Sequence, residues 1–419
     1  MKAMPVIIAI AVVCLRTCAA DATTNRNSRT GPFILGAEVS WAPEDEADGA
    51  EYYDHGVRKD LFEILKDYQF NYIRLRLFVD PGAPDGYAAH RKEAFGDLAH
   101  VEAMAKRAKA AGMGILLDIH YSDTWSSPGH QKKPLAWQYL DFPGLTRAVH
   151  DFTGQAIKGL KDNGTPADMV QIGNEISDGL LFPDGRRSDR DNFAMLLKAG
   201  IAGAKEADPS VKIVLHHHLG RSNERMRPWL DNLIQRGVPF DIIGMSCYAQ
   251  AQEGDWKTNF DDLATRYPDK GLLVVEYSAR KRFINDLMFN TPDRKGLGTF
   301  IWEPTRHREA LFDQDGKNAG GGQASNFTTD DGINQGARLT RANPISATNL
   351  PVGATNATNV AANTNPPESV YRSFGTNEAA RAEWRKRRFG GRYDVNELMD
   401  LYPQMSKDYS QITAGQPKN

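Results

Sequence analysis

Two glutamates lie at the ends of apolar segments, and they give the first indication of chemistry in this sequence. Glu175 follows the segment 169–173, and Glu276 ends the segment 272–276. A carboxylate at the end of a buried strand costs free energy unless it has a partner or a function. Two facing carboxyl groups, one protonated and one ionised, can cleave a glycosidic bond, and their separation decides whether the anomeric configuration is retained. The pair therefore predicts a general acid and a nucleophile.

Other polar side chains belong to neighbouring apolar segments. Arg74 and Arg76 alternate with apolar residues in 72–78, so they share one face of a strand. A cation beside a carboxylate favours its ionised form. Either arginine could therefore support a catalytic glutamate, or it could only hold one in a structural salt bridge. Asp118 likewise has two interpretations, because it could orient a neighbouring side chain or pair with a buried cation.

The elements that must position these residues alternate regularly. Short segments rich in leucine and β-branched residues are typical of strands buried on both faces. Between them, apolar residues recur at helical spacing. The predicted strands are 33–39, 72–78, 114–119, 169–173, 211–216, 240–247, 272–276 and 298–302. The predicted helices are 57–68, 98–111, 145–161, 191–206, 224–236, 260–267 and 279–289.

This alternation predicts an α/β fold, a (β/α)8 TIM barrel, whose active-site groups gather at the carboxyl ends of the strands. A doubly wound sheet is the alternative. However, no glycine-rich phosphate loop follows the first strand. Polar residues also end many strands, whereas a doubly wound sheet would gather them at one switch point. In the barrel, Glu175 and Glu276 would face each other across the mouth.

The composition excludes several other classes of protein. The chain has 51 Lys and Arg against 53 Asp and Glu, a net charge of −2 that argues against a strongly basic nucleic-acid-binding protein. Hydrophobic residues make up 41% and charged residues 25%, which argues against wholesale disorder. Three cysteines are too few for a disulfide scaffold or a multi-cysteine zinc site. We expect a monomer with no nucleic-acid partner.

The N-terminal residues have the pattern of an export signal. Lys2 precedes the short apolar run 6–13, and the small residues 19–20 suit cleavage. The run is too short to span a bilayer, and no other segment is apolar for long enough. We therefore expect a secreted or periplasmic protein without a membrane span. Lipidation of Cys18 is the less favoured alternative, because the residues before it fit a lipoprotein signal poorly.

The amino-acid composition changes after the last predicted strand. The stretch 318–377 is rich in Gly, Ala, Asn and Thr, which predicts a partly disordered insertion, and 378–388 is predicted as a solvated basic helix. The expected organisation is a signal peptide (1–20), a flexible leader (21–32), the barrel (33–317), a low-complexity insertion (318–390) and a C-terminal helix that closes the barrel (391–419).

The motifs of the barrel resemble those of glycoside hydrolase family 53. The stretches that carry the resemblance are GAEVSW (36–41), YIRLRLFVDP (72–81), LLDIHYSDTWSSPGHQKKPLAW (116–137), VQIGNEISDGLLFPDG (170–185), DIIGMSCY (241–248), LLVVEYS (272–278) and FIWEP (300–304). That family comprises arabinogalactan endo-β-1,4-galactanases of a large retaining (β/α)8 clan. The resemblance implies a secreted, retaining enzyme whose partner is β-1,4-galactan.

The resemblance also implies the roles of the two glutamates. Glu175, preceded by Asn174, matches the clan's Asn-Glu pair, so Glu175 would be the general acid/base. Asn174 would then hydrogen-bond the sugar 2-hydroxyl. Glu276 matches the nucleophile of the seventh strand, and Arg74 or Arg76 would keep it ionised.

Further mouth positions follow from the same resemblance. His120 and Tyr248 match positions that bracket the nucleophile and the substrate. Trp302 matches an aromatic platform for the sugar ring. Trp125 and Trp137 could extend this platform, or each could belong to the core of its loop.

Two loops depart from the family pattern. In the family pattern, Thr and an aromatic–proline turn follow the nucleophile, whereas this chain has Tyr-Ser-Ala-Arg at 277–280. The loop 249–252 lacks the usual proline and aromatic residue. These loops would build outer subsites. Another β-linked galactoside or a shorter oligosaccharide therefore remains an alternative substrate, and a non-catalytic carbohydrate-binding barrel remains an alternative function.

We predict no metal and no cofactor. His216 and His218 share one face of a strand, as some metal ligands do, but no carboxylate motif accompanies them. Some bacterial family members bind calcium in late loops, but the oxygens of Asp313, Asp315 and Asn318 have no recognisable calcium-loop spacing. Cys247 has no neighbouring base motif, so we expect a buried structural thiol.

Overall fold

The computed structural model describes residues 28–248, 254–306, 310–314 and 377–415. The predicted signal peptide with Cys18, the loop 249–252 and most of the predicted insertion therefore lie outside the described residues. Among the described residues, no helix is long and apolar enough to cross a bilayer.

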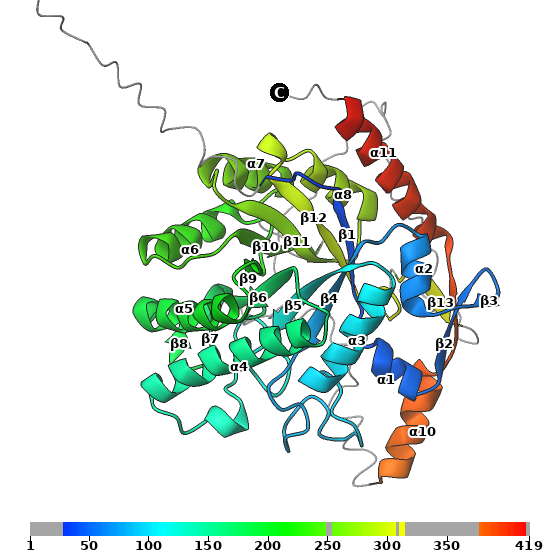
Figure 1. Ribbon diagram of the computed structural model, residues 1–419, viewed down its shortest axis with the longest axis horizontal. Coiled ribbons are helices and arrows are strands. Elements are labelled where there is room, and N and C mark those ends of the chain that lie inside the picture. Colours follow the sequence, from blue (N-terminus) through cyan, green and yellow to red (C-terminus); the bar gives the residue numbers. More distant parts are fainter. Residues whose placement is uncertain (1–27, 249–253, 307–309, 315–376, 416–419) are drawn as a thin grey trace, which may run out of the picture.

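Eight parallel strands close into a barrel in the order β1-β12-β11-β10-β9-β6-β5-β4, at the centre of Figure 1. Their bounds are β1 Ile34–Glu38, β4 Tyr72–Leu77, β5 Gly114–Ile119, β6 Met169–Ile172, β9 Lys212–His217, β10 Ile242–Ser246, β11 Gly271–Tyr277 and β12 Gly296–Trp302. The predicted TIM barrel is confirmed. All eight predicted strands are present, and their ends differ from the predicted ends by at most two residues.

Helices surround the strands (Figure 1). They are α2 Leu61–Asp67, α3 Leu98–Ala110, α4 Phe142–Asp162, α5 Arg190–Ala207, α6 Asn223–Gln235, α7 Trp256–Arg266, α8 Lys281–Phe289 and α11 Leu401–Gly415. Five of them begin at an aspartate whose side chain accepts a backbone N–H of the first turn. The helix predicted over 57–68 begins only after Asp60, because residues 57–58 form a short strand, β3 Val57–Arg58.

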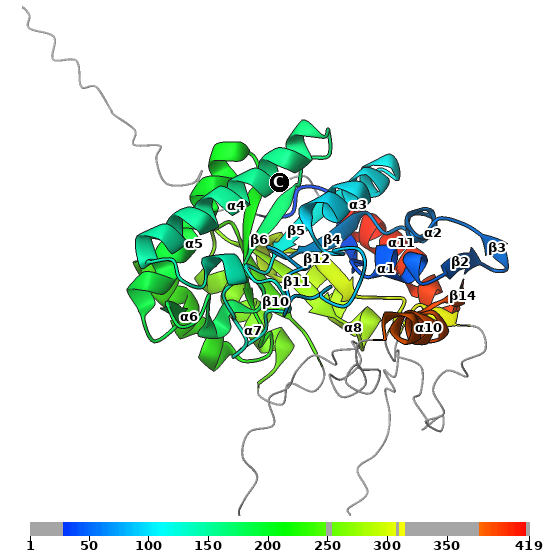
Figure 2. The ribbon, with the colours of Figure 1, turned by 90° about the horizontal axis from the view of Figure 1, so that it is seen from below.

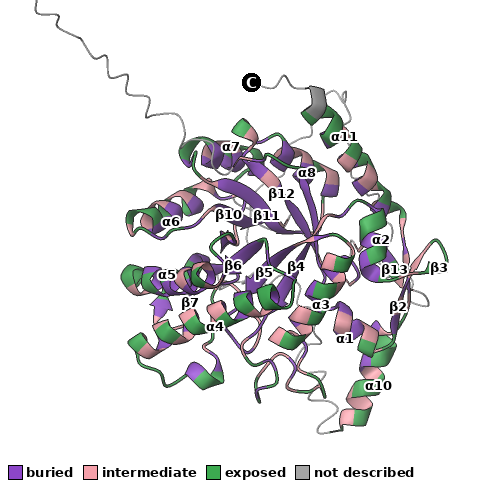
Figure 3. Cartoon of the chain, in the orientation of Figure 1, coloured by how far each residue is buried: buried purple, intermediate pink, exposed green. Residues whose placement is uncertain are grey.

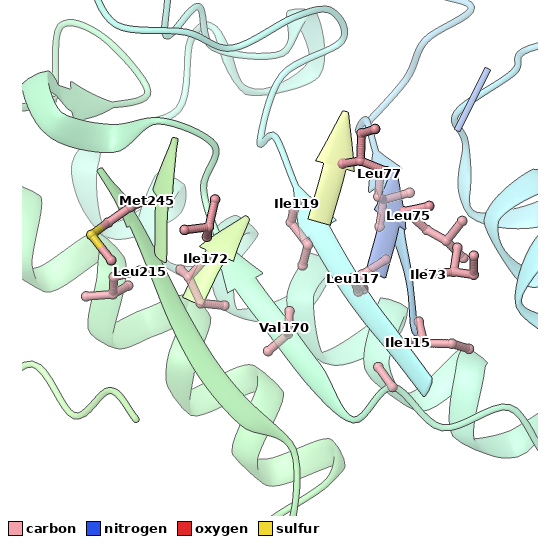
Figure 4. Packing of buried hydrophobic residues seen from close by; sticks show 14 of the residues in the cluster. Ile73, Leu75, Leu77, Ile115, Leu117, Ile119, Val170, Ile172, Leu215 and Met245 are labelled. Atoms are coloured by element: carbon pink, nitrogen blue, oxygen red, sulfur yellow. The ribbon is translucent and has the colours of Figure 1, made fainter. Parts of the chain in front are cut away.

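The strands are buried on both faces, and the outer helices expose only their far sides (Figure 3). Alternate residues of each strand point outward to the helices, such as Ile73 and Leu75 of β4 (Figure 4). A smaller cluster fills the barrel interior, comprising Ile34, Leu116, Met169, Val214, Ile242, Leu273, Val275 and Phe300. Gly36 is required there, because a Cβ at that position would lie 2.4 Å from the Phe300 ring. Further along β4, the inward positions are Arg74 and Arg76.

A second sheet lies beside the barrel, in the order β13-β14-β2-β3 (Figures 1 and 2). It combines β2 Ala50–Asp54 and β3 with β13 Phe312–Gln314 and β14 Gly391–Val395, next to helices α1 Ala42–Ala47 and α10 Glu378–Phe389. The strand β14 lies where the sequence pattern predicts only the C-terminal helix. Polar residues alternate with Tyr393 and Val395 in this strand, and only these two are buried.

The C-terminal helix α11 packs on the outside of the barrel between α8 and the end of α2. The Tyr409 ring stacks on Phe289 at 4.2 Å, and the Tyr402 ring lies 4.2 Å from Phe70. Shorter elements complete the described chain: the hairpin β7 Gly179–Leu180 and β8 Gly185–Arg186, and the 3-10 turns η1 Leu135–Trp137, η2 Ile176–Asp178, η3 Pro292–Arg294 and η4 Glu397–Asp400.

Candidate active site

Glu276 lies at the carboxyl end of β11 inside the barrel mouth, and only 2% of its surface is exposed. Arg74 Nη1 lies 2.9 Å from its Oε1, and the hydroxyl of Tyr248 donates to its Oε2 at 3.0 Å. Arg74 comes from β4, so the ion pair crosses the barrel interior. Of the two arginines that the sequence leaves open as partners, Arg74 is therefore the one that contacts this carboxylate.

Arg74 is the centre of a buried network. Its guanidinium also donates to Asp118 at 2.8 Å, to Asn174 Oδ1 at 2.9 Å and to Glu38 at 3.2 Å. Burial raises the pKa of Asp118, but Arg74 and His120 outweigh burial and hold that pKa below its ordinary value. Asp118 thus does both things that the sequence left open. It pairs with a buried cation, and it contacts His120 Nε2 at 3.0 Å.

Glu175 follows β6 in a left-handed backbone conformation, with φ 48° and ψ 49°. Such a conformation is strained for a residue with a side chain and is often found at functional sites. The Ser246 hydroxyl donates to Glu175 Oε1 at 2.8 Å. Because Ser246 of β10 is also in register with Glu276 of β11, this strand brings the two glutamates to one place.

The two carboxyl groups have different surroundings. Burial, and then the charge of Glu276, raise the pKa of Glu175 to about 8. Burial also raises the pKa of Glu276, to about 7, against the lowering effects of Arg74 and the Tyr248 hydrogen bond. The ion pair with Arg74 and the Tyr248 hydrogen bond therefore favour the ionised form of Glu276. Pairs of carboxyl groups with separated pKa values are typical of acid–base sites.

Asn174 is held from three sides. Its Oδ1 accepts from Arg74, its Nδ2 donates to the Ser126 carbonyl at 2.8 Å, and its own carbonyl accepts from Gln131 at 2.8 Å. These bonds fix the orientation of the amide, whose second N–H can donate to a substrate hydroxyl. His120 is fixed similarly, since its Nδ1 accepts from the Ser126 N–H at 3.0 Å.

Arg76 does not contact Glu276. It is buried, and it pairs with Glu303 at 3.3 Å and with Glu38 at 3.7 Å. Its guanidinium lies 4.1 Å from the centre of the Trp125 ring. Glu303, which no sequence motif indicates as an ion-pair partner, is fully buried beyond β12, and burial raises its pKa well above the ordinary value.

The tryptophans divide into two groups. Trp125 and Trp302 are half-buried neighbours with ring centres 5.9 Å apart, and Trp41 lies 5.8 Å from Trp302. Trp137 is buried instead and packs edge-on against Phe152, with ring centres 5.9 Å apart. Trp125 therefore lies beside the predicted platform residue, whereas Trp137 belongs to the core of its loop.

The three consecutive histidines have separate partners. His216 contacts Ser246, the Glu175 N–H and Asn174 Oδ1. His217 packs edge-on against Trp229, and His218 contacts the Ser177 hydroxyl. Within the part of the chain that the structure describes, no group of three or more His, Cys, Asp or Glu side chains could hold a metal ion. Cys247 is buried, and burial raises the pKa of its thiol.

One departure from the family pattern has a structural explanation. Tyr277, directly after Glu276, points away from the mouth, and its hydroxyl lies 2.8 Å from that of Tyr402 on α11. It is fully buried in the outer core. A change at this position alters packing beneath the last helix, so Tyr277 itself builds no subsite at the mouth.

Comparison with known proteins identifies the family of this chain. The sequence model of glycosyl hydrolase family 53 matches residues 34–283, which include both glutamates and all of their contacts described above. The chain belongs to this family. The resemblance seen in the motifs is thereby confirmed, and the family makes the protein a glycoside hydrolase.

Individual relatives align with more than half of this chain. The chain is 34% identical over 252 residues to arabinogalactan endo-beta-1,4-galactanase A of Aspergillus niger, covering 58% of this chain and 69% of that one. It is 36% identical over 315 residues to an uncharacterized protein of Niallia circulans, covering 65% and 83%.

Solved structures of the family are also similar. The GH53 catalytic domain of Ignisphaera aggregans is 35% identical with a TM-score of 0.61, over 65% of this chain and 85% of that one. A fungal beta-1,4-galactanase is 27% identical with a TM-score of 0.60, over 66% and 90%.

Proposed function

We propose that this family 53 enzyme is an endo-β-1,4-galactanase that cleaves galactan by retaining double displacement, with Glu276 as nucleophile and Glu175 as acid/base. The observation that carries the proposal is the contrast between two buried carboxyl groups in one mouth. Glu276 is paired with the cation Arg74, whereas Glu175 accepts a hydrogen bond from the neutral hydroxyl of Ser246. The substrate class rests on relatives such as the Aspergillus niger galactanase.

In the first step, a Glu276 oxygen attacks the anomeric carbon while Glu175 transfers its proton to the glycosidic oxygen. The carbon–oxygen bond to the leaving sugar breaks, and a glycosyl ester on Glu276 forms. The charge of Arg74 and the hydroxyl of Tyr248 favour the ionised nucleophile. The raised pKa of Glu175 keeps a proton available for the leaving group.

In the second step, water attacks the ester, and Glu175 accepts a proton from that water. Esterification removes the charge of Glu276, which is one of the two main causes that raise the pKa of Glu175. That pKa therefore falls when a base is needed. Two displacements at the same carbon restore the β configuration, and the second proton transfer restores the enzyme.

The remaining mouth residues bind substrate in this proposal. Asn174 donates its second amide N–H to the sugar 2-hydroxyl, and Trp302 with Trp125 offers an apolar surface to the sugar ring. His120 lies beside Trp125, with ring centres 5.9 Å apart, and bounds the same space. We also propose that residues 1–20 direct export, which N-terminal sequencing of the mature protein would test.

Digestion of linear β-1,4-galactan, followed by chromatography of the products over time, tests the function. A ladder of short galacto-oligosaccharides supports endo action on this polymer, with Glu276→Ala protein as the blank. Absence of products from folded protein contradicts the proposed substrate. A panel of other β-galactosides then distinguishes the alternative substrate from a non-catalytic barrel, which would bind saturably without turnover.

A further inference from the structure

We propose that His216 and Ser246 form a two-point clamp on Glu175, which orients its carboxyl group and directs a hydroxyl hydrogen to one carboxyl oxygen. Both would be positioning residues for proton transfer by Glu175. This inference rests on the proposed acid/base role of Glu175. Beyond that role, His216 and Ser246 would set the orientation of the Glu175 carboxyl group.

The first point of the clamp is the backbone of Glu175. Its N–H donates to His216 Nδ1 at 3.2 Å. His216 Nδ1 also lies 3.1 Å from Asn174 Oδ1, but that oxygen already accepts from Arg74 and Gln171. The peptide N–H of Glu175 can only donate. We therefore assign Nδ1 as its acceptor, with the single proton of the neutral ring on Nε2. This contact holds the residue whose left-handed backbone turns the side chain into the mouth.

The second point is the carboxyl group. His216 Nε2 lies 2.8 Å from the Ser246 hydroxyl oxygen, and that hydroxyl lies 2.8 Å from Glu175 Oε1. Because Nε2 carries the proton, it donates to the serine oxygen, and the serine hydrogen points to Glu175. Oε1 is thereby occupied as an acceptor. The acid proton belongs on Oε2, which stays available for the glycosidic oxygen.

This arrangement of hydrogen bonds requires a neutral His216, because a protonated ring could not accept the Glu175 N–H at Nδ1. The ring is fully buried, and burial, followed by the charges of Arg74, His217, His218 and His120, lowers its pKa well below the ordinary value. The charged groups that act on Glu175 itself are Glu276, Arg74 and Asp118. None of these contacts Ser246 through a hydrogen bond in the described structure, so a change at Ser246 acts on Glu175 alone among the acidic groups.

A second serine–histidine pair provides a matched control. Ser177, two residues after Glu175, is buried and contacts His218 Nδ1. Among the contacts that the structure describes, this pair touches neither glutamate. Ser177→Ala therefore removes the same chemical group from the same neighbourhood without altering the clamp.

The test compares Ser246→Ala with Ser177→Ala. Cleavage of galactan needs a proton for its poor leaving group, whereas a dinitrophenyl β-galactobioside does not. For Ser246→Ala we expect kcat/KM to fall roughly tenfold on galactan and to change little on the activated substrate. In the wild-type enzyme, the Ser246 hydroxyl lowers the pKa of Glu175. Ser246→Ala should therefore raise this pKa and shift the alkaline limb of the pH profile to higher pH. Ser246→Thr, which keeps the hydroxyl, restores the wild-type limb.

Equal behaviour of Ser246→Ala and Ser177→Ala in both readouts overturns the clamp while leaving the proposed function intact. If the wild-type enzyme cleaves neither substrate, the proposed function fails instead. Glutamate carboxyl ¹³C NMR, with the Glu175 signal assigned by its loss in Glu175→Gln, still tests the clamp in that case. A titration midpoint that rises in Ser246→Ala and not in Ser177→Ala supports it, and an unchanged midpoint overturns it.

Discussion

The guanidinium of Arg74 lies 2.9 Å from the carboxylate of Glu276, although the two residues belong to strands that do not pair in the barrel. Arg74 Nη2 also binds Asn174, the neighbour of Glu175. One buried side chain thus connects the predicted nucleophile to the segment that carries the predicted acid. Because Asp118 and Glu38 hold the same guanidinium, its position is fixed before substrate binds.

Arg74→Met should change both the pH profile and the stability of the enzyme. Arg74 lowers the pKa of Glu276, so its loss raises that pKa and moves the acidic limb of kcat/KM to higher pH. Leaving buried carboxylates without their cation should lower the free energy of unfolding by about 3–5 kcal/mol. Arg76→Met is the control, because it removes a buried guanidinium that does not contact Glu276. Urea denaturation should show a lower free energy of unfolding for this variant, while the acidic limb of its pH profile stays in place. An unmoved limb in Arg74→Met contradicts the pairing.

Glu276→Ala should lower kcat by at least about 10⁴-fold, since no covalent intermediate can form. Azide can enter the vacated space and attack the anomeric carbon once, which gives a glycosyl azide of inverted configuration. NMR of the product of an activated aryl glycoside measures this. Glu63→Ala, at an exposed position on α2, is the control and should behave as wild type. Wild-type turnover in Glu276→Ala excludes this residue as nucleophile.

Glu175→Ala should affect substrates according to their leaving groups. The loss in kcat/KM should be about 10²–10⁴-fold on galactan, because a sugar leaves poorly without a proton. It should be small for a dinitrophenyl glycoside, whose leaving group needs none. A Brønsted plot over a series of aryl glycosides measures the difference. An equal loss across the series argues against an acid role.

The wild-type pH profile of kcat/KM should be bell-shaped. Glu276 must be ionised, so activity falls as pH drops through its pKa of about 7. Glu175 must be protonated, so activity falls as pH rises through its pKa of about 8. The limbs report the coupled pair in the free enzyme. Initial rates at low substrate concentration measure them, and a profile that rises steadily without an alkaline limb contradicts the assignment of the acid.

Trp302→Ala should mainly affect substrate binding, whereas Trp137→Ala should mainly affect stability. Trp302 is half-buried at the mouth, so its loss should raise KM for galactan roughly tenfold with a small change in stability. Trp137 is buried in its loop, so its loss should lower the free energy of unfolding by about 3–5 kcal/mol and affect KM less. Steady-state kinetics and urea denaturation separate the two. An unchanged KM in Trp302→Ala excludes the platform.

The barrel could be predicted from the sequence because its signals are local. Strands buried on both faces are continuous apolar runs, and Glu175 and Glu276 stand out because each is charged at the end of such a run. The strand β14 could not be predicted in this way, because only alternate residues are buried and its pairing partners β2 and β13 lie far away in the sequence.

The partners of the site residues were harder to predict, because they depend on side chains from different strands. Nothing in the local sequence distinguishes Arg74 from Arg76, yet one meets Glu276 and the other meets Glu303. The link from His216 through Ser246 to Glu175 joins side chains from β9, β10 and the segment after β6, which helices separate in the sequence. One available signal was missed: Glu38 ends an apolar strand just as Glu276 does.

The most direct test of the account is proton NMR of linear β-1,4-galactan from the first moments after wild-type enzyme is added. Retaining endo cleavage predicts that new reducing ends appear first as the β anomer, and that the α anomer grows later through mutarotation. First appearance of the α anomer would mean that water attacks directly, so Glu276 would be a base and no covalent intermediate would form. That result would contradict the double displacement on which the roles of Glu175 and Glu276 depend.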